Sequence, residues 1–168
     1  MNTTYYIVRH GHTFYTKNKL EYGDKVLVAR LAKSTYPQIK KIGNYFKNIK
    51  TEANYSSKIL RARQTTKIIN RESGKDFVYD SRLNEMYNES VDDLKNRVVD
   101  FLDEINKKNY NAVIIITHGA VIAALKHLLL ENSFDESKLY DYPNPETVCI
   151  INGKNFEIID FGENKIKN

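Results

Sequence analysis

The sequence has a single cysteine and no long apolar segment, and these two absences exclude several classes of protein. Cys149 has no second cysteine to pair with, so the fold cannot depend on an internal disulfide framework. The apolar runs near Ala112 and Ala120 are far too short to span a bilayer. The N-terminus, Met1 to Thr4, shows no basic region followed by a long apolar one, so no signal peptide is visible. We therefore expect a cytoplasmic protein that does not insert into a membrane.

Internal repeats, low-complexity segments and linkers are also missing, so the 168 residues predict one domain with a sizeable core. Apolar residues make up 41% of the chain and charged residues 28%, as is ordinary for globular proteins. The 26 basic side chains exceed the 21 acidic ones, which gives a net charge of +5. This excess suits an anionic ligand, but it is spread along the chain. Charge alone therefore indicates a solvated basic surface.

Apolar runs predict the strands of a mostly parallel sheet. Residues 5–8 form a run that leads straight into a cation, an imidazole and a glycine, and residues 112–117 form the most apolar run of the chain. Both are typical of buried strands, and the second is expected to lie centrally, covered on both faces. Further strands are expected at residues 53–56, 77–79, 146–151 and 156–161, the last two joined by the hairpin turn signal Asn152-Gly153.

Helical periodicity between these strands predicts four helices, so that strand and helix alternate as in a doubly wound α/β sheet. Ser34, Thr35 and Pro37 indicate a helix start with a hydroxyl cap, and Ser90 with Asp93 indicates a capping box. Residues 14–25 are expected to form an exposed loop, and the tail from Asn164 to fray. The apolar residues at helical spacing are Ile39, Ile42, Phe46 and Ile49; Ala62, Thr65, Ile68 and Ile69; Leu94, Val98, Phe101, Leu102 and Ile105; and Val121, Ile122, Leu125 and Leu129.

Three of the predicted strands end in residues suited to a phosphoryl group. The first is followed by Arg9-His10-Gly11, the second by Ser56-Ser57 and then Arg61, and the apolar one by Thr117-His118-Gly119. Ligands of open α/β sheets bind outside the carboxyl ends of the strands, so we expect these residues to meet. Two arginines and two histidines would repel one another unless an anion held them together. Arginine forks match the charged oxygens of a phosphoryl group, and a neutral imidazole can attack its phosphorus.

In order and spacing, these motifs resemble the histidine phosphatase superfamily, which includes the cofactor-dependent phosphoglycerate mutases. The likeness extends over residues 5–151. It implies a single histidine-phosphatase-like domain over residues 1–168, built as a doubly wound, mostly parallel sheet with an antiparallel edge and helices on both faces. It implies neither a metal nor a cofactor. The matching segments are Arg9-His10-Gly11 with Thr13, the Ser-Ser, Arg-Ala and Gln-Thr pairs within residues 56–65, Leu83-Asn84-Glu85, and His118-Gly119.

The resemblance implies a role for each of these residues. His10 would be the nucleophile that takes the phosphoryl group as phosphohistidine. Arg9, Arg61 and His118 would hold the phosphoryl oxygens and neutralise charge in the transition state. Glu85 would protonate the leaving oxygen and then activate water.

Other positions are less well matched to the family. Thr16 stands where the family often has asparagine, yet it can still donate to a phosphate, and backbone NH groups after Gly119 could add to the anion site. Glu89 lies close enough to Glu85 in the sequence to serve as the acid instead. The family's Gly-x-Trp-Glu-Gly element after the acid is missing, and Tyr22-Gly23-Asp24 is the nearest likeness to its first-loop motif. Because such segments shape substrate choice in the family, the substrate stays open.

Within the family, hydrolysis is favoured over phosphoryl transfer between hydroxyl groups. About twenty-six residues separate Glu85 from the apolar strand, and one predicted helix fills them. Water should therefore reach the phosphohistidine, whereas a mutase must keep it dry. Compact protein phosphohistidine phosphatases tend to lack the Leu-x-Glu carboxylate. We thus expect a phosphomonoesterase, monomeric or homodimeric, that acts on a small-molecule phosphate ester and not on nucleic acid.

Two further readings start from the same residues. His10-Gly11-His12 is also a His-x-His sequence, which binds metal at a strand end in amidohydrolase-type enzymes, but those need a longer (β/α) barrel and further ligands. The other reading is a phosphate-binding module without catalysis. It is disfavoured because all four central residues and a candidate acid are present.

Overall fold

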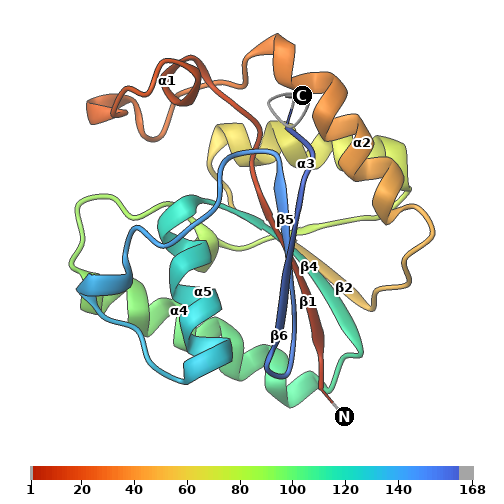
Figure 1. The fold of residues 1–168 in the computed structure, drawn as a ribbon, viewed down its shortest axis with the longest axis vertical. Helices are drawn as coiled ribbons and strands as arrows, with labels where there is room; N and C mark the ends of the chain where they lie inside the picture. The colour runs from red at the N-terminus through yellow and green to blue at the C-terminus, as the bar shows by residue number, and fades with distance from the viewer. Residues whose placement is uncertain (1, 163–168) are drawn as a thin grey trace, which may run out of the picture.

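A computed structural model of the chain describes residues 2–162, and these form one mixed sheet with helices on both faces (Figure 1). The tail from Asn164, expected to fray, lies outside the described residues. In the order of the sheet, the strands are β3 (Val78–Tyr79), β2 (Ala53–Ser56), β4 (Ala112–Thr117), β1 (Thr4–Arg9), β5 (Thr147–Asn152) and β6 (Asn155–Asp160). The helices are α1 (Phe14–Lys17), α2 (Tyr36–Phe46), α3 (Leu60–Ser73), α4 (Val91–Lys108) and α5 (Gly119–Glu131). Short 3₁₀ turns are η1 (Gly23–Lys25), η2 (Lys33–Thr35), η3 (Ser81–Leu83) and η4 (Glu136–Lys138).

The parallel part of the sheet is centred on β4, which pairs in parallel with β1 and β2. β3 extends this part beyond β2, whereas β5 runs antiparallel to β1 and forms a hairpin with β6. The predicted α/β fold with an antiparallel edge is therefore confirmed. The register sets Arg9 beside Thr117 and Ser56 beside Ile116. As a result β1, β2 and β4 end level with one another, and the residues that follow them leave the sheet side by side.

The two faces of the sheet carry separate apolar cores, and β4 contributes to both. α4 and α5 cover one face, and α2 and α3 cover the other (Figure 1). Val113 and Ile115 belong to the first core, whereas Ile114 and Ile116 belong to the second. None of the four has any exposed surface, which explains why an unbroken apolar run encodes this strand. No helix in residues 2–162 is long and apolar enough to cross a membrane.

The capping box predicted before α4 is confirmed, because the Ser90 hydroxyl accepts from the Asp93 NH at 3.0 Å and Asp93 accepts from the Ser90 NH at 3.2 Å. The exposed loop predicted for residues 14–25 is partly wrong. It contains α1, which has a capping box of its own: the Thr13 hydroxyl accepts from the Thr16 NH, and the Thr16 hydroxyl accepts from the Thr13 NH.

The hydroxyl cap predicted for α2 is wrong. Thr35 has helical backbone angles, and its side chain makes no cap hydrogen bond. Its hydroxyl instead accepts from the His12 NH at 3.0 Å and donates to the Glu146 carboxylate at 2.5 Å. These bonds tie the segment after β1 to the start of β5. α2 also ends at Phe46, so that Ile49 follows the helix.

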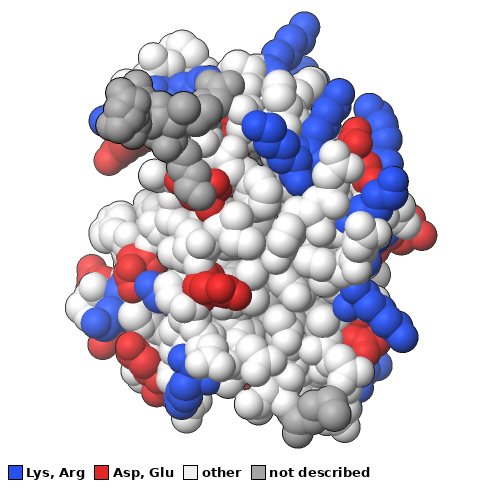
Figure 2. Space-filling model, turned by 45° about the vertical axis from the view of Figure 1, so that its right-hand side comes forward, with Lys and Arg blue, Asp and Glu red and all other residues white. Residues whose placement is uncertain are grey.

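The surface charge is mixed on the face shown in Figure 2. Lysine and arginine side chains are most numerous on the right-hand side of this view, others lie at its lower left, acidic side chains lie among both groups, and much of the face is uncharged. This pattern agrees with a dispersed basic excess. The structure must therefore gather its cations elsewhere if it binds an anion specifically.

We predict that Phe101→Ala destabilises the protein by about 3–5 kcal/mol. Phe101 has no exposed surface, and its ring lies perpendicular to that of Tyr55 at a centroid distance of 5.2 Å. Urea unfolding measures the loss. The matched control is Phe14→Ala, because 63% of Phe14 is exposed, and its effect should stay within about 0.5 kcal/mol. Equal losses in the two variants would contradict the assigned core.

Candidate active site

The level ends of β1 and β4 bring His10 and His118 together. Their rings lie 5.1 Å apart between centroids, tilted by 56°. The His10 NH donates to the carbonyl of Thr117 at 3.1 Å, which continues the strand pairing by one residue. Neither histidine has any exposed surface. The two predicted His-Gly ends therefore meet in one enclosed place.

His10 is held as a neutral imidazole with a defined tautomer. Its Nδ1 lies 2.7 Å from the carbonyl oxygen of Gly11, which can only accept, so Nδ1 carries the hydrogen. Nε2 accepts from Arg61 Nε at 3.3 Å. Burial holds the pKa of His10 well below its usual range, and the charges of Arg61 and Arg9 lower it further. The lone pair of a nucleophile is therefore available at Nε2 over a wide range of pH.

Gly11 allows the helical layer to approach this segment closely. A Cβ atom at this position would lie 2.5 Å from the Ile39 side chain and 2.7 Å from the Thr35 hydroxyl. The Gly11 NH donates to the Thr65 hydroxyl at 3.1 Å, and that hydroxyl donates to the Arg61 carbonyl at 2.9 Å. The turn after β1 is thus fixed to α2 and α3, and α3 carries Arg61 toward His10.

Both predicted arginines lie near the histidines, and each has a guanidinium N–H group that makes no hydrogen bond within residues 2–162. Arg61 has no exposed surface, and burial lowers the pKa of both guanidinium groups while the Glu85 carboxylate opposes this shift. Arg61 Nη1 donates to the carbonyl of Val26, but its Nη2 is buried without a hydrogen-bond partner in the described part of the chain. Arg9 Nη1 donates to the carbonyl of Pro143 at 2.8 Å, and its Nε is likewise buried and unpaired within residues 2–162. Unpaired buried cationic donors are costly, and an anion would satisfy them.

His118 is positioned by a chain of hydrogen bonds from β2 and the segment after η3. The Ser57 hydroxyl donates to Asn84 Oδ1 at 3.1 Å, so it must accept from His118 Nε2 at 2.8 Å. His118 Nδ1 is buried and has no partner among the described residues. Burial, with Arg61 and His10, holds the pKa of His118 well below its usual range, so that Nδ1 is unprotonated here. A bound phosphoryl anion would favour protonation of Nδ1 and make it a third donor.

Glu85 lies near the arginines, whereas Glu89 is already paired. Burial raises the pKa of Glu85, opposed by Arg61, by the Met86 NH at 2.9 Å and by Arg9. The carboxyl group thus keeps its proton to higher pH, as a general acid requires.

Glu89 forms a two-oxygen ion pair with Arg97, whose Nη1 also donates to the carbonyl of Arg82 at 2.6 Å. Glu85 is therefore the better candidate of the two.

Thr16 and Gly119 lie at the periphery of this group. The Thr16 hydroxyl accepts from the Thr13 NH at 2.8 Å and lies 2.9 Å from His12 Nδ1, so it is occupied within the α1 turn. Its role as a phosphate ligand stays a prediction. Gly119 is the first residue of α5, and the positive end of that helix points toward the site. A Cβ atom there would lie 2.7 Å from the Tyr142 ring, so that ring requires the glycine.

His10, His118 and Arg61 lie beneath the protein surface, and aromatic rings cover both arginines. The Tyr22 ring lies over Arg61 at 4.2 Å from its Cζ, and the Tyr142 ring lies over Arg9 at 4.9 Å. The sequence patterns did not predict that Tyr22 and Tyr142 would cover the two arginines; these rings are called the covers below. Tyr22 lies in the first-loop segment that departs from the family, but no sequence signal marks Tyr142.

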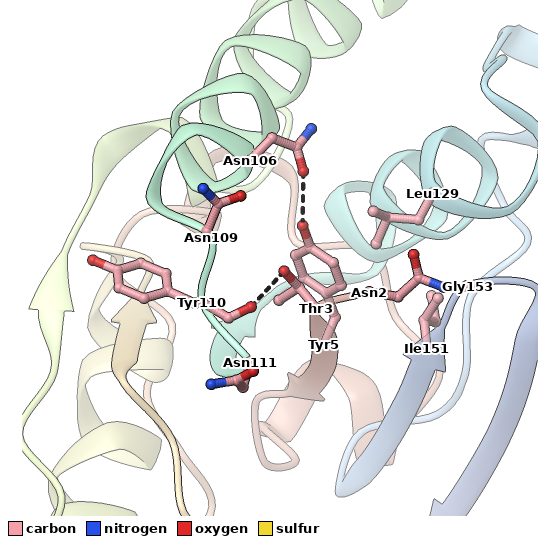
Figure 3. A pocket seen from close by; sticks show the side chains of 10 residues that line it. All are labelled: Asn2, Thr3, Tyr5, Asn106, Asn109, Tyr110, Asn111, Leu129, Ile151 and Gly153. Carbon is pink, nitrogen blue, oxygen red and sulfur yellow. Dashed lines mark hydrogen bonds between the residues drawn. The ribbon is translucent and has the colours of Figure 1, made fainter.

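A hollow of about 690 Å³ adjoins the candidate site, and Arg9, His12, Thr16, Lys17, Lys19 and Tyr142 are among the residues that line it. A hollow of about 460 Å³ lies at the opposite end of the sheet, where asparagine, threonine and tyrosine supply the polar lining and none of the described lining residues is charged (Figure 3). Tyr5 donates there to Asn106 at 3.4 Å.

Within residues 2–162, no group of three or more His, Cys, Asp or Glu side chains is placed to hold a metal ion. The His10 and His12 rings contact different partners.

Comparison with known proteins adds to this geometry. The profile of the histidine phosphatase superfamily (branch 1) matches residues 5–88 and 87–158. No curated protein sequence matches the chain. An alpha-ribazole phosphatase from Shigella flexneri has a TM-score of 0.77 at 15% identity, covering 94% of this chain and 95% of that one. A phosphoglycerate mutase from Bacillus anthracis has a TM-score of 0.71 at 16% identity, with 95% and 94% covered. A mycobacterial glucosyl-3-phosphoglycerate phosphatase, solved with VO₃, has a TM-score of 0.76 at 16% identity, with 94% and 98% covered. At these identities the likeness shows a shared fold.

The unpaired donors predict that orthovanadate binds beside His10 and that Arg61→Ala weakens this binding by a factor on the order of 10² or more. Titration calorimetry measures the change. Arg63→Ala is the matched control, since Arg63 lies on the same helix but is exposed, and it should bind vanadate like the parent. If the two variants bind equally well, Arg61 is not part of the anion site.

Proposed function

We propose, from the premise that this chain belongs to the histidine phosphatase superfamily, that it hydrolyses small-molecule phosphomonoesters through a phosphohistidine at His10. One observation carries the proposal. Neutral His10, with its lone pair at Nε2, is buried near donors of Arg9 and Arg61 that have no partner in the described chain. Because His10 has no exposed surface, a small ester suits this site better than a side chain carried on another protein.

In the first step, His10 Nε2 attacks phosphorus and the bond from phosphorus to the ester oxygen breaks. Arg61 Nε, which donates to Nε2 in this structure, would turn its hydrogen bond to a phosphoryl oxygen. Arg9, Arg61 and protonated His118 would share the charge of the transition state. Glu85 gives its proton to the departing alkoxide, so that a neutral alcohol leaves.

In the second step, water attacks the phosphohistidine. Glu85, now a carboxylate, takes a proton from the water as its oxygen bonds to phosphorus. The bond between phosphorus and Nε2 breaks, and inorganic phosphate and neutral His10 are regenerated. The Gly11 carbonyl holds Nδ1–H throughout, which keeps the attacking nitrogen the same in each cycle.

The closed pocket favours one second candidate, a mutase that returns the phosphoryl group to another hydroxyl of the same molecule. Behind Tyr22 and Tyr142 a phosphohistidine would be shielded from water. The products separate the two reactions, because hydrolysis releases inorganic phosphate in step with alcohol, whereas a mutase releases none and yields a positional isomer.

For the nucleophile, we predict that His10→Ala abolishes turnover of p-nitrophenyl phosphate, because it removes the attacking lone pair that His10 Nε2 holds beside Arg61. The wild type, quenched without acid during turnover, should carry a phosphoryl group on His10, detected by mass spectrometry. His127→Gln is the control, since His127 contacts Glu131 and Asp141 and the amide of the variant can still donate to Asp141, and it should remain active. A label found on another residue would refute the assignment.

For the acid, we predict that Glu85→Gln slows hydrolysis of alkyl phosphates far more than formation of phosphohistidine from p-nitrophenyl phosphate, whose phenolate leaves unaided. Phosphohistidine should accumulate with the activated ester, because the amide side chain of this variant cannot take a proton from water. Glu89→Gln is the matched control and should show neither effect, since Glu89 is paired with Arg97.

The same assignment fixes the pH dependence of the first step. The raised pKa of Glu85 keeps the acid protonated above its ordinary value of 4.5, and the lowered pKa of His10 keeps the nucleophile neutral below 6.5. Activity toward alkyl phosphates should therefore peak between these two shifted pKa values and fall as pH rises through that of Glu85. Glu85→Gln should remove this fall. If Glu89→Gln removes it instead, the acid was misassigned.

A further inference from the structure

Two tyrosines from separate segments cover the arginines of the proposed phosphoryl pocket, the space beside His10, Arg9 and Arg61. Tyr22 covers Arg61 and Tyr142 covers Arg9. With both rings in place, His10, His118 and Arg61 have no exposed surface. Part of the structure must therefore move before a substrate reaches His10, and the contacts of the two rings indicate which of them is held more weakly.

Tyr142 is anchored on both sides and fills its site. The Asp141 carboxylate before it accepts from Lys126 at 2.9 Å and from His127 at 2.6 Å, both on α5. The Pro143 carbonyl after it accepts from Arg9 at 2.8 Å. Its ring also packs so closely on Gly119 that a Cβ atom there would lie within 2.7 Å. Moving Tyr142 would break an ion pair and two further hydrogen bonds, so it acts as a fixed wall.

The Tyr22 segment, residues 18–28, is held much more weakly. Leu20, Leu27 and Val28 are 51%, 52% and 57% exposed, so the segment buries little apolar surface. The Tyr22 hydroxyl lies 3.0 Å from that of Thr13, and its ring lies 5.2 Å from that of Tyr15. Segments with few buried apolar contacts open at a small cost in free energy.

Opening this segment would also complete the anion site. In the closed form the Val26 carbonyl accepts from Arg61 Nη1 and thereby occupies a donor that a phosphoryl oxygen would use. Nη2 of the same guanidinium is already unpaired within the described residues. Exchange of a neutral carbonyl for a charged phosphoryl oxygen strengthens the hydrogen bond, so phosphate binding favours the open segment.

We propose that Tyr22 is the movable wall of the phosphoryl pocket and that its ring limits the size of the alcohol part of the substrate. A hollow of about 690 Å³ beside Tyr142 is lined by Arg9, His12 and Thr16 among others, but neither His10 nor Arg61 lines it. The Tyr22 ring covers Arg61, which contacts His10, so we place the alcohol on the side where the Tyr22 segment opens. The size limit rests on the proposed phosphatase activity, whereas the motion of the segment does not.

Hydrogen exchange of the intact protein tests the motion without any substrate. Backbone NH groups of Lys25, Val28 and Ala29 are bonded within the Tyr22 segment or at its end, and those of Asp141 and Tyr142 are bonded beside the fixed wall. The first group should exchange at least about tenfold faster than the second. The reverse order would overturn the assignment of the movable and fixed walls.

Modification by diethyl pyrocarbonate, which attacks neutral imidazoles, tests whether Tyr22 controls access to His10. Peptide mass spectrometry should show His10 modified at least about tenfold faster in Tyr22→Ala than in the wild type. Tyr22→Phe, which keeps the ring, should stay near the wild type. Tyr79→Ala is the matched control, because Tyr79 is a partly exposed tyrosine on β3. An unchanged rate in Tyr22→Ala would refute the gate even if the protein proves to be an active phosphatase.

Kinetics test the size limit. In Tyr22→Ala the ratio of kcat/KM for a bulky alkyl phosphate to that for a small one should rise at least about tenfold, with no such change in Tyr79→Ala. An unchanged ratio would refute the size limit. Complete inactivity of the wild type toward all phosphate esters would refute the proposed function instead, and the exchange and modification experiments would still decide the motion.

Discussion

The burial of two guanidinium groups beside two imidazoles is the constraint on which the site depends. Like charges in a buried space raise the free energy of the folded protein unless some groups lose their charge or find partners. Here His10 and His118 stay neutral, while each arginine has an aromatic face and a carbonyl oxygen as partners. Within the described residues, Arg9 Nε and Arg61 Nη2 stay buried without a hydrogen-bond partner. The protein's own groups thus satisfy the pocket incompletely, and a phosphoryl anion is the ligand that would complete it.

The sheet makes this arrangement unavoidable. Parallel pairing of β1 and β2 with β4 sets their ends level, so the residues that follow each strand converge whatever their charge. β4 has to be apolar on both faces because a helical layer packs on each, and it therefore carries no polar residue until Thr117. The Thr117 hydroxyl then donates to the Leu83 carbonyl at 2.6 Å, which fixes the segment that presents Glu85. A single strand thus positions His118 directly and the candidate acid through one hydrogen bond.

Features encoded by local pattern were predictable from the sequence. The strands, the capping box at Ser90 and the convergence of the strand-end residues followed from apolar periodicity and from the rule for parallel sheets. Features set by tertiary contacts were not. The hydroxyl and proline before α2 suggested a cap, but two bonds to distant residues compete successfully for the Thr35 side chain. Gly119 was expected only as part of a motif, whereas its missing side chain makes room for a ring 23 residues away in the sequence. The closure of the pocket depends on that ring, so no local pattern could reveal it.

Closure also bears on the choice between hydrolysis and internal transfer. A short chain between Glu85 and β4 suggested that water reaches the phosphohistidine, yet the pocket is closed by the first-loop segment and by the segment before β5. If the proposed phosphohistidine forms, access of water to it would be set by how long the covers stay open relative to its lifetime, and not by the length of the chain around the acid. If the cover at Tyr22 opens to release the alcohol, the same opening admits water before a second hydroxyl can be positioned. A pocket with one weakly held wall thus favours hydrolysis, whereas a mutase would need both walls to stay closed between its two transfers.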